Sequence, residues 1–481
     1  MNKECKIISL PDFKKARMRK KGPRSVIYQE TKLPTTLTTF AQGKSFFIRT
    51  YGCQANVRDS ETMAGLLIKA GFKAKKRPND ADIILLNTCA VRENAEDKVY
   101  GEIGSLKALK MNNPNLIIGI CGCMAQQEHT VVIIKEKYPQ VDLVFGTHNL
   151  HQLLELLNTI ITEKVKVIDV KSEQGAVIEV SEVNRFDTKK AFVNITYGCD
   201  RFCTYCIVPY TRGQERSRNK KDILAECRKL VEEGYQEITL LGQNVNAYGK
   251  DAPEEGDFAS LLEAVAKLGI SRLRFVTSHP FDFTDNLIAV IAKYPNIMKS
   301  IHLPVQSGSD EILRRMGRRY TRAHYLELVK KMREQIPNLM LTTDIIVGFP
   351  GETLENFRDT LSLVDQVGYD GAFTFIYSPR KGTPASLIVD DVNSEEKKKR
   401  FLELVKHTEK STAKSSANLI GGTYRVLVDG VSKRNQMRLS GYLENGKLVH
   451  FEGDSSLIGK IVKVKIIASK VYSLQGEYVK D

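Results

Sequence analysis

The chain has 481 residues, of which 42% are hydrophobic and 27% charged, and its formal net charge is +15; this balance is typical of a soluble globular protein of about two to four domains. The nine cysteines are too few and too clustered for a disulfide framework, which favours a reducing compartment. No stretch approaches the roughly 18 consecutive apolar residues of a membrane span, and the N-terminus lacks a signal-peptide pattern, so we expect a cytoplasmic protein with no membrane partner.

The positive charge lies mainly at the two ends of the chain. Residues 1–45 hold 11 Lys and Arg against 3 Asp and Glu, and residues 411–481 hold 11 against 6. Both ends are therefore predicted to contact a polyanion, with solubility alone as the alternative. Because the stretch 14–21 shows no apolar periodicity, we expect residues 1–45 to be a mobile arm. A mitochondrial transit peptide is the rival interpretation, which the acids Glu4 and Asp12 disfavour.

Residues 46–164 alternate between strand-like and helical patterns. Strands are expected at Phe46–Tyr51, Ala81–Leu86, Leu116–Ile120 and Val141–Phe145, with amphipathic segments between them. Such alternation predicts an open parallel α/β domain.

Three cysteines follow three of these strands. Cys53, Cys89 and Cys123 each lie just past the carboxyl end of a predicted strand. Ligands bind at this edge of open α/β sheets, so the three thiolates are expected to converge on a metal site. Three separate structural cysteines are the alternative, which the recurrence at one structural position disfavours. The neighbouring Cys121 terminates its strand and is expected to pack in the core.

A polar, β-prone connector, residues 165–190, precedes six further strand–helix repeats over residues 191–410. Repeats of this kind predict a partial (βα)6-type barrel, in which chemistry takes place at the carboxyl ends of the strands. The six strands are expected at Ala191–Thr196, Glu237–Leu241, Leu273–Thr277, Ser300–Val305, Met340–Val347 and Gly371–Tyr377.

The first strand of this barrel leads into Cys199, Cys203 and Cys206, which are spaced four and then three residues apart. Three clustered cysteines in such a chain indicate a metal site. A structural zinc site would need a fourth ligand, and the next cysteine, Cys227, shares a helix face with apolar residues. Three thiolates suit a four-iron cluster with one iron open to a cofactor or substrate, with zinc as the alternative.

Residues 411–481 change to short strands separated by Gly turns. A small, basic, all-β module of this kind predicts an OB-like barrel that binds single-stranded or looped RNA, with a purely structural cap as the alternative. The stretch Ser411–Ser416 before it is expected to be a hinge. The five strands are expected at Tyr424–Asp429, Arg438–Leu443, Lys447–Phe451, Ile461–Ile467 and Tyr472–Val479.

The cysteine triplet and its surroundings resemble the radical S-adenosylmethionine enzymes, in particular their methylthiotransferase branch. The resemblance extends from Phe46 to Val479 and includes the last domain, which in that branch is called TRAM and binds RNA. The segments that carry it are Tyr51–Asn56, Asn87–Glu93, Gly122–Ala125, Thr196–Gly213, Leu303–Ser309, Thr343–Glu352 and Arg380–Ala385.

The resemblance implies two [4Fe–4S] clusters and S-adenosylmethionine as cofactors. The triplet would hold the cluster that binds S-adenosylmethionine and cleaves it to a radical, which takes hydrogen from carbon 2 of an adenine. The three strand-end cysteines, Cys53, Cys89 and Cys123, would hold an auxiliary cluster that supplies sulfur, and a second S-adenosylmethionine would methylate this sulfur. An external electron donor such as a flavodoxin or ferredoxin is implied, and a monomer is expected.

Within the branch, Tyr51–Asn56 and Asn87–Glu93 are most similar to the members that modify N6-dimethylallyladenosine at position 37 of tRNA. The implied reaction inserts a methylthio group at carbon 2 of that base in the anticodon stem-loop, which must be splayed out to reach the barrel. The alternatives are N6-threonylcarbamoyladenosine 37 as the substrate and, from a different class, a non-catalytic iron–sulfur protein that binds RNA.

Five further residues are implied as parts of the cofactor or substrate pocket. Tyr205 lies where the superfamily has an aromatic residue near the adenine of S-adenosylmethionine. Gln243, Gln306 and Asp344 would be polar wall residues at the mouth of the barrel. Arg315 would pair with a carboxylate or a phosphate.

Overall fold

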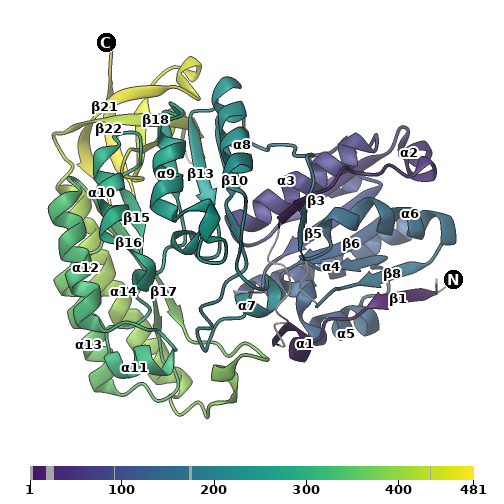
Figure 1. The fold of residues 1–481 in the computed structure, drawn as a ribbon, viewed down its shortest axis with the longest axis horizontal. Helices are drawn as coiled ribbons and strands as arrows, with labels where there is room; N and C mark the ends of the chain where they lie inside the picture. Colours follow the sequence, from purple (N-terminus) through teal and green to yellow (C-terminus); the bar gives the residue numbers. More distant parts are fainter. Residues whose placement is uncertain (1–3, 18–25, 91–92, 173–175, 434, 481) are drawn as a thin grey trace. The chain divides into compact units, whose positions relative to one another are not determined.

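The computed structural model describes residues 4–17, 26–90, 93–172, 176–433 and 435–480 (Figure 1). The chain divides into two units. The first consists of residues 1–187, 194–202 and 206–219, and the second of residues 188–193, 203–205 and 220–481. No helix in the described part of the chain combines the length and the apolar character needed to cross a bilayer.

The first unit is built on a seven-stranded sheet in which every neighbouring pair is parallel. A parallel sheet needs crossover helices on its faces, so its central strands are buried on both sides and read as apolar runs. In spatial order the strands are β1 (Cys5–Ser9), β8 (Lys166–Asp169), β7 (Leu143–Phe145), β6 (Ile117–Gly122), β5 (Ile83–Thr88), β3 (Ser45–Thr50) and β4 (Lys73–Ala74).

Helices cover both faces of this sheet, because alternate strand residues point to opposite sides. Ile83 and Leu85 of β5 face one core, whereas Ile84 and Leu86 face the other. The first core is closed by α2 (Thr35–Ala41), α3 (Gln54–Lys69) and α6 (Leu153–Glu163), and the second by α4 (Glu93–Asn112) and α5 (Glu128–Lys137). The predicted open parallel α/β domain is therefore present.

The structure corrects the prediction of a mobile arm over residues 1–45, whereas the predicted β-prone connector over residues 165–190 contains the strands β8 and β9. β1 pairs in parallel with β8 at the edge of the sheet, and β2 (Val26–Tyr28) pairs with β9 (Val177–Glu179). Backbone hydrogen bonds form these pairs, and an edge strand needs no apolar alternation, so periodicity did not predict β1 and β2. A short helix, α1 (Phe13–Arg17), follows β1. Residues 1–3 and 18–25 of the predicted arm lie outside the described residues.

All six strands expected for the partial barrel are present, and they belong to the second unit except for Asn194 at the end of β10. They form two three-stranded sheets, in which β13 pairs in parallel with β14, and β16 pairs in parallel with both β15 and β17. The strands are β10 (Lys190–Asn194), β13 (Glu237–Leu241), β14 (Arg272–Phe275), β15 (Ser300–His302), β16 (Met340–Val347) and β17 (Gly371–Ile376). The helices between and after them are α8 (Lys220–Glu232), α9 (Phe258–Ala266), α10 (Asp285–Lys293), α11 (Asp310–Arg315), α12 (Arg322–Gln335), α13 (Leu354–Val367) and α14 (Ser394–Ala417).

The last five strands close into a barrel around an apolar core, as the sequence predicted. Arg272 of β14 fastens this barrel within the second unit, because its guanidinium donates to the carbonyls of Tyr442 at 2.8 Å and Arg425 at 2.9 Å. In spatial order the strands are β18 (Thr423–Ser432), β19 (Asn435–Leu443), β20 (Leu448–Glu452), β22 (Leu474–Val479) and β21 (Ile461–Ser469).

The expected hinge at Ser411–Ser416 is instead the last part of α14. Its serines remain helical because their hydroxyls find tertiary partners. Ser411 Oγ donates to the carbonyl of Tyr369 at 2.7 Å, and Lys447 Nζ donates to Ser416 Oγ at 2.7 Å. These contacts outweigh the weak local helix preference of serine.

Candidate metal centres

Three cysteines lie at the carboxyl ends of three neighbouring strands of the first unit. Cys53 follows β3 and occupies the N-cap position of α3, Cys89 follows β5, and Cys123 follows β6. In the sheet β5 lies between β3 and β6. Cys53 is exposed, whereas Cys89 and Cys123 are 4% and 5% exposed. The sheet topology therefore brings together three loops that are remote in sequence, as the strand-end pattern predicted.

Two glycines let these loops approach closely. Gly52 has a φ of +107°, and a Cβ placed there would lie 2.7 Å from Cys89 Cβ. Gly122 has a φ of +90°, and a Cβ there would lie 2.4 Å from the carbonyl oxygen of Thr88. Only glycine accepts both the backbone conformation and the close contact.

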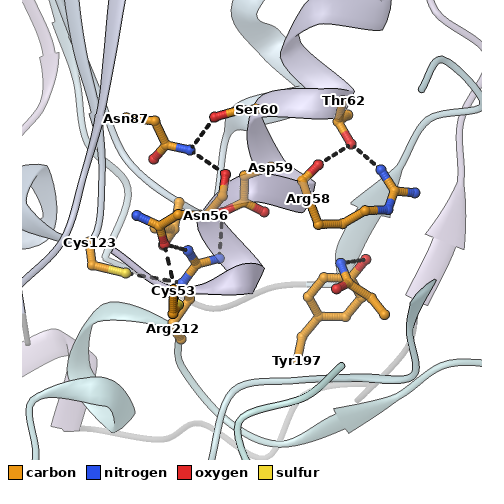
Figure 2. Close-up of polar contacts among 12 residues, drawn as sticks. Cys53, Asn56, Arg58, Asp59, Ser60, Thr62, Asn87, Cys123, Tyr197 and Arg212 are labelled. Atoms are coloured by element: carbon orange, nitrogen blue, oxygen red, sulfur yellow. Dashed lines mark hydrogen bonds and ion pairs between the residues drawn. The ribbon is translucent and has the colours of Figure 1, made fainter. Parts of the chain in front are cut away.

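Two buried asparagines fix the loops to one another (Figure 2). Asn56 Nδ2 donates to the carbonyls of Tyr51 at 2.8 Å and Thr88 at 2.9 Å, the residues two before Cys53 and one before Cys89. Asn87 Nδ2 donates in turn to the carbonyl of Asn56 at 2.8 Å and to Ser60 Oγ at 3.0 Å. A buried amide that bonds two strand ends holds them at one separation.

Arg212 extends this network to Cys123. It follows α7 (Val208–Thr211), and its Nε donates to Cys123 Sγ at 3.1 Å. Its Nη2 donates to Asn56 Oδ1 at 2.7 Å, and its Nη1 pairs with Asp59 Oδ2 at 2.7 Å (Figure 2). Arg212 is a residue that the sequence interpretation missed. The signal available was an arginine inside the Thr196–Gly213 segment, but no sequence pattern states which side chain it reaches.

The electrostatics around Cys123 fit an anionic group held by thiolates. Burial raises the pKa of the Cys123 thiol to about 11, and the Arg212 charge acts in the opposite direction. Burial, together with the charges of Arg216 and Arg212, lowers the pKa of His148 to about 3, so this imidazole is neutral. A buried thiol against a guanidinium is suited to become a metal-bound thiolate, because the metal replaces the proton and the arginine offsets the added charge.

Within the described ranges, no three His, Cys, Asp or Glu side chains lie close enough together to ligate one metal ion. A four-iron cluster is ligated by thiolates at its corners, and three cysteines leave one of its irons open.

Two other cysteines pack in cores, as the sequence predicted. Cys121 Sγ lies 3.7 Å from both Met63 Sδ and the carbonyl oxygen of Leu86, inside the core of the sheet. Burial raises the pKa of this thiol well above its ordinary value. Cys227 is fully buried on α8.

The segment that carries the cysteine triplet follows β11 (Thr196–Tyr197), which pairs with β12 (Arg216–Ser217) in the first unit. Cys199 N donates to the carbonyl of Gly213 at 3.0 Å. Gly198 before it has a φ of +73°, and a Cβ there would lie 2.0 Å from the carbonyl oxygen of Gln214. Cys199 and Cys206 belong to the first unit and are partly exposed, and the spacing of the triplet along the chain is what groups them with Cys203.

Cys203 belongs to the second unit and has its own arginine. Arg318 Nη1 donates to Cys203 Sγ at 3.4 Å, while its Nη2 donates to the carbonyl of Pro304 at 2.8 Å. Burial disfavours the charge of Arg318, but Tyr320, Tyr205 and Cys203 outweigh it and raise the arginine's pKa. Arg318 was also missed from the sequence. A cation hydrogen-bonded to a thiol again fits a metal-bound thiolate.

Three of the five predicted pocket residues lie on the barrel strands or their cysteine loop. Tyr205 packs against an apolar cluster that includes Phe349 and Tyr377. Gln306 follows β15 with a φ of +72°, and its N donates to the carbonyl of Asp344 at 2.9 Å. The Asp344 carboxylate on β16 lies 3.4 Å from His302 Nε2.

The other two predicted residues are less constrained. Gln243 follows β13 and is partly exposed. Arg315 at the end of α11 pairs with Glu311 one turn earlier at 2.7 Å, and both side chains are largely open to solvent. Arg315 Nη1 also donates to the carbonyl of Pro350 at 3.4 Å, whereas the buried Arg318 three residues later contacts a cysteine.

Three family models match the chain. The Radical SAM superfamily matches residues 193–364, the Uncharacterized protein family UPF0004 matches residues 45–146, and the TRAM domain matches residues 418–479. UPF0004 thus covers most of the α/β domain, the Radical SAM superfamily most of the partial barrel, and the TRAM domain the closed barrel.

Known proteins match over almost the whole chain. Proteins named tRNA-2-methylthio-N(6)-dimethylallyladenosine synthase from Oceanobacillus iheyensis and Bacillus subtilis (strain 168) are each 52% identical over 98% of this chain, which is 91% and 92% of their own lengths. The protein of that name from Geobacillus kaustophilus is 51% identical over 98% of this chain and 89% of its own.

Solved structures agree in fold. The radical S-adenosylmethionine methyltransferase TsrM from Kitasatospora setae has a TM-score of 0.51 at 13% identity, over 72% of this chain and 75% of its own. The cobalamin-dependent S-adenosylmethionine radical enzyme OxsB has a TM-score of 0.50 at 14% identity, over 76% of this chain and 56% of its own. At such low identity the likeness concerns the fold alone.

Proposed function

The chain belongs to the tRNA-2-methylthio-N(6)-dimethylallyladenosine synthase family of radical S-adenosylmethionine enzymes, and on that premise we propose that it inserts a methylthio group at carbon 2 of N6-dimethylallyladenosine at position 37 of tRNA. The observation that carries this proposal in the structure is the convergence of Cys53, Cys89 and Cys123 on adjacent strand ends. A radical S-adenosylmethionine enzyme needs only the triplet for radical formation, so a second set of three cysteines supports a reaction that also needs sulfur.

Six cysteines would hold the two [4Fe–4S] clusters. Cys53, Cys89 and Cys123 would ligate the auxiliary cluster, and the triplet would ligate the cluster that binds S-adenosylmethionine. When bound, these groups supply the radical and the sulfur, which side-chain acids and bases cannot supply. The protein's own contribution is to hold the thiolates, exclude water and orient the base.

The arginines next to the cysteines support these assignments. Arg212 donates to Cys123 Sγ and Arg318 donates to Cys203 Sγ, each from a buried position. A fixed positive charge at each sulfur stabilises the thiolate form and does not need to reorganise during the reaction.

The cofactor pocket would be formed by residues of the second unit. Tyr205 would pack near the adenine of S-adenosylmethionine, with Gln306, Asp344 and Gln243 as polar wall residues. His302 lies beside Asp344, because its Nδ1 is 3.0 Å from Thr342 Oγ1 and its Nε2 is 3.4 Å from the Asp344 carboxylate. Arg315 would contact a carboxylate or phosphate from its more exposed position.

The closed barrel would bind the tRNA. The match to the TRAM domain covers all five strands, and a tRNA substrate is in keeping with the relatives. Exposed basic residues lie on the neighbouring strands β18 and β21. In the strand register Arg425 lies opposite Lys463, and Lys465 lies opposite Thr423. Such a stripe would release counterions from phosphates. We further infer a cytoplasmic monomer that receives electrons from a flavodoxin or ferredoxin.

The test is mass spectrometry of modified nucleosides after incubation of the iron–sulfur-loaded protein with dimethylallyl-bearing tRNA, S-adenosylmethionine and a reductant. The expected product is 2-methylthio-N6-dimethylallyladenosine. Production of 5′-deoxyadenosine without methylthiolation of this tRNA, and methylthiolation of N6-threonylcarbamoyladenosine instead, would assign the chain to the other substrate. Failure to form 5′-deoxyadenosine with both clusters intact would contradict the radical mechanism.

A further inference from the structure

Arg212 contacts the strand-end cysteine Cys123 directly, and it is only 8% exposed. Its three nitrogen contacts go to three different groups: a thiol, an amide and a carboxylate. A buried guanidinium held on all sides has little freedom to relax, so it imposes a fixed charge and a fixed geometry on its surroundings.

The charge is placed asymmetrically. Arg212 Nε lies 3.1 Å from Cys123 Sγ, whereas the compensating carboxylate of Asp59 contacts the far nitrogen, Nη1, at 2.7 Å. The positive end of the pair therefore faces the cysteine. Hydrogen bonds and positive charges at the sulfur ligands of an iron–sulfur cluster favour its reduced state and raise its reduction potential.

The contact with Asn56 transmits the position of Arg212 to the other two loops. Arg212 Nη2 donates to Asn56 Oδ1, and Asn56 Nδ2 donates to the carbonyls of Tyr51 and Thr88. The loops that carry Cys53 and Cys89 are thus joined, through one amide, to the guanidinium that contacts Cys123.

The segment that carries Arg212 also packs on this site. Ile207 and Tyr210 share an apolar cluster with Cys123 and Ala90, and Thr147 Oγ1 donates to the carbonyl of Thr211 at 2.6 Å. This segment begins directly after Cys206, so the chain that leaves the triplet is fixed to the strand-end cysteines within the first unit.

We propose that Arg212 is a positioning residue that holds the three strand-end cysteine loops in place and sets the reduction potential of the cluster they bind. This inference rests on the proposed function, since it takes Cys53, Cys89 and Cys123 as ligands. The negative charge of Asp59 partly offsets that of Arg212, so the two residues are expected to shift the reduction potential in opposite directions.

The experiment uses the full chain with Cys199, Cys203 and Cys206 replaced by Ala, so that only the auxiliary cluster is loaded. Its midpoint potential is measured by redox titration with electron paramagnetic resonance detection, and its iron content is determined. In this background Arg212→Gln is expected to shift the midpoint to more negative values, because the charge and the hydrogen bond to sulfur are lost. Asp59→Asn is expected to shift it to more positive values, because the arginine is then uncompensated.

Arg212→Lys is the matched control, since it retains the charge without the planar fork. It should keep the midpoint close to that of the parent while losing iron faster during gel filtration. If Arg212→Gln holds no cluster, Asp59→Asn still tests the effect of the charge on the midpoint, with Arg212→Lys as the control that keeps the charge. A purely structural role would leave the midpoint unchanged in all variants, or move it in the same direction for Arg212→Gln and Asp59→Asn, and would overturn the inference.

This failure differs from a failure of the proposed function. If the parent with three alanines binds no iron, the strand-end cysteines are not ligands and the proposed function loses its auxiliary cluster. If it binds four irons but its potential ignores both Arg212 and Asp59, the ligand assignment stands and only the present inference is wrong.

Discussion

A single amide determines much of the geometry at the strand-end cysteines. Asn56 is fully buried, and each of its polar atoms contacts a different part of the site. Removing one partner from such a network leaves buried carbonyls unsatisfied, at a cost of about 1–3 kcal/mol. The residues adjacent to the ligands thus decide whether the ligands can act together.

Replacing Asn56 by Ala tests this role. We expect a loss of about 2 kcal/mol in the free energy of unfolding and a markedly lower iron content at the auxiliary site. Asn296→Ala is the matched control, because Asn296 Nδ2 also donates to two carbonyls, those of Ala266 and Ile270, at 2.8 and 3.1 Å. Urea unfolding of the metal-free protein and iron analysis compare the two. Equal iron loss in both variants would contradict a specific role for Asn56.

The two sets of cysteines should separate in function. Cys206→Ala is expected to abolish cleavage of S-adenosylmethionine, whereas Cys89→Ala should spare cleavage and stop methylthiolation. Cys121→Ala serves as the control. Its thiol lies in the core of the sheet and is not an expected ligand, so this variant should retain the iron of both clusters. 5′-Deoxyadenosine and the modified nucleoside are quantified in the same reaction. Equal loss of cleavage in the first two variants would argue against two separate roles.

At the scale of elements, the turn after β6 shows how backbone conformation permits the site. Gly122 combines a left-handed φ with a Cβ position that the neighbouring strand end occupies. A side chain there would push β6 away from β5, and with it Cys123 from Cys89. The turn therefore requires glycine twice over, for its dihedral angle and for its space.

Gly122→Ala is expected to destabilise the protein by about 2–5 kcal/mol, from left-handed strain and the clash together. Gly43→Ala is the matched control, because Gly43 also has a positive φ, +73°, but a Cβ there would meet nothing within 4 Å. It should show only the strain, about 1–2 kcal/mol. The free energies of unfolding in urea give both values, and equal losses would show that the clash with Thr88 is relieved.

Glu182 fixes its segment of the first unit to the end of α3, because Lys69 of that helix pairs with it. Burial acts to raise the pKa of this carboxyl, but hydrogen bonds from Lys69, Thr31 and Ser181 outweigh it and lower the pKa to about 2. An unfolded glutamate titrates near pH 4.3. The depressed pKa therefore contributes stability that is present above about pH 4.3 and is lost as the pH falls toward about 2.

Glu182→Gln should consequently lower stability at pH 6 and remove part of the loss that the parent shows between about pH 4.3 and pH 2. Glu232→Gln on the exposed surface of α8 is the control and should lower stability at pH 6 by less than Glu182→Gln does. Urea unfolding of the metal-free protein across this range measures the difference. A variant whose stability falls as steeply as that of the parent would contradict this account of Glu182.

At the scale of the whole molecule, the net charge of +15 and its concentration at the chain ends agree with a polyanionic partner. Charge of this kind acts through counterion release, so it makes binding sensitive to salt. The chemistry at the cysteines involves no such release, and the two dependences can be separated.

Affinity for tRNA is expected to fall by at least about tenfold between 50 and 200 mM KCl if three or more phosphates are contacted. Replacing Lys463 and Lys465 of β21 by Gln should reduce the slope of the logarithm of the affinity against the logarithm of the salt concentration. Filter binding over a series of salt concentrations measures it. Replacing Lys330 and Lys331 of α12 is the control, and an equal reduction there would show that the effect is one of net charge rather than of the barrel surface.

Sequence by itself determined the alternation of strands and helices, the six cysteines and the family resemblance. Apolar periodicity and residue spacing are local properties, so they can be identified from the sequence alone. Only the tertiary structure decided that β1 completes the sheet, that α14 continues through Ser411–Ser416, and that Arg212 reaches Cys123 across 89 residues. These outcomes depend on hydrogen bonds and burial between segments that are remote in sequence. Such contacts produce no periodic pattern in the sequence and form only when the folded chain brings those segments together.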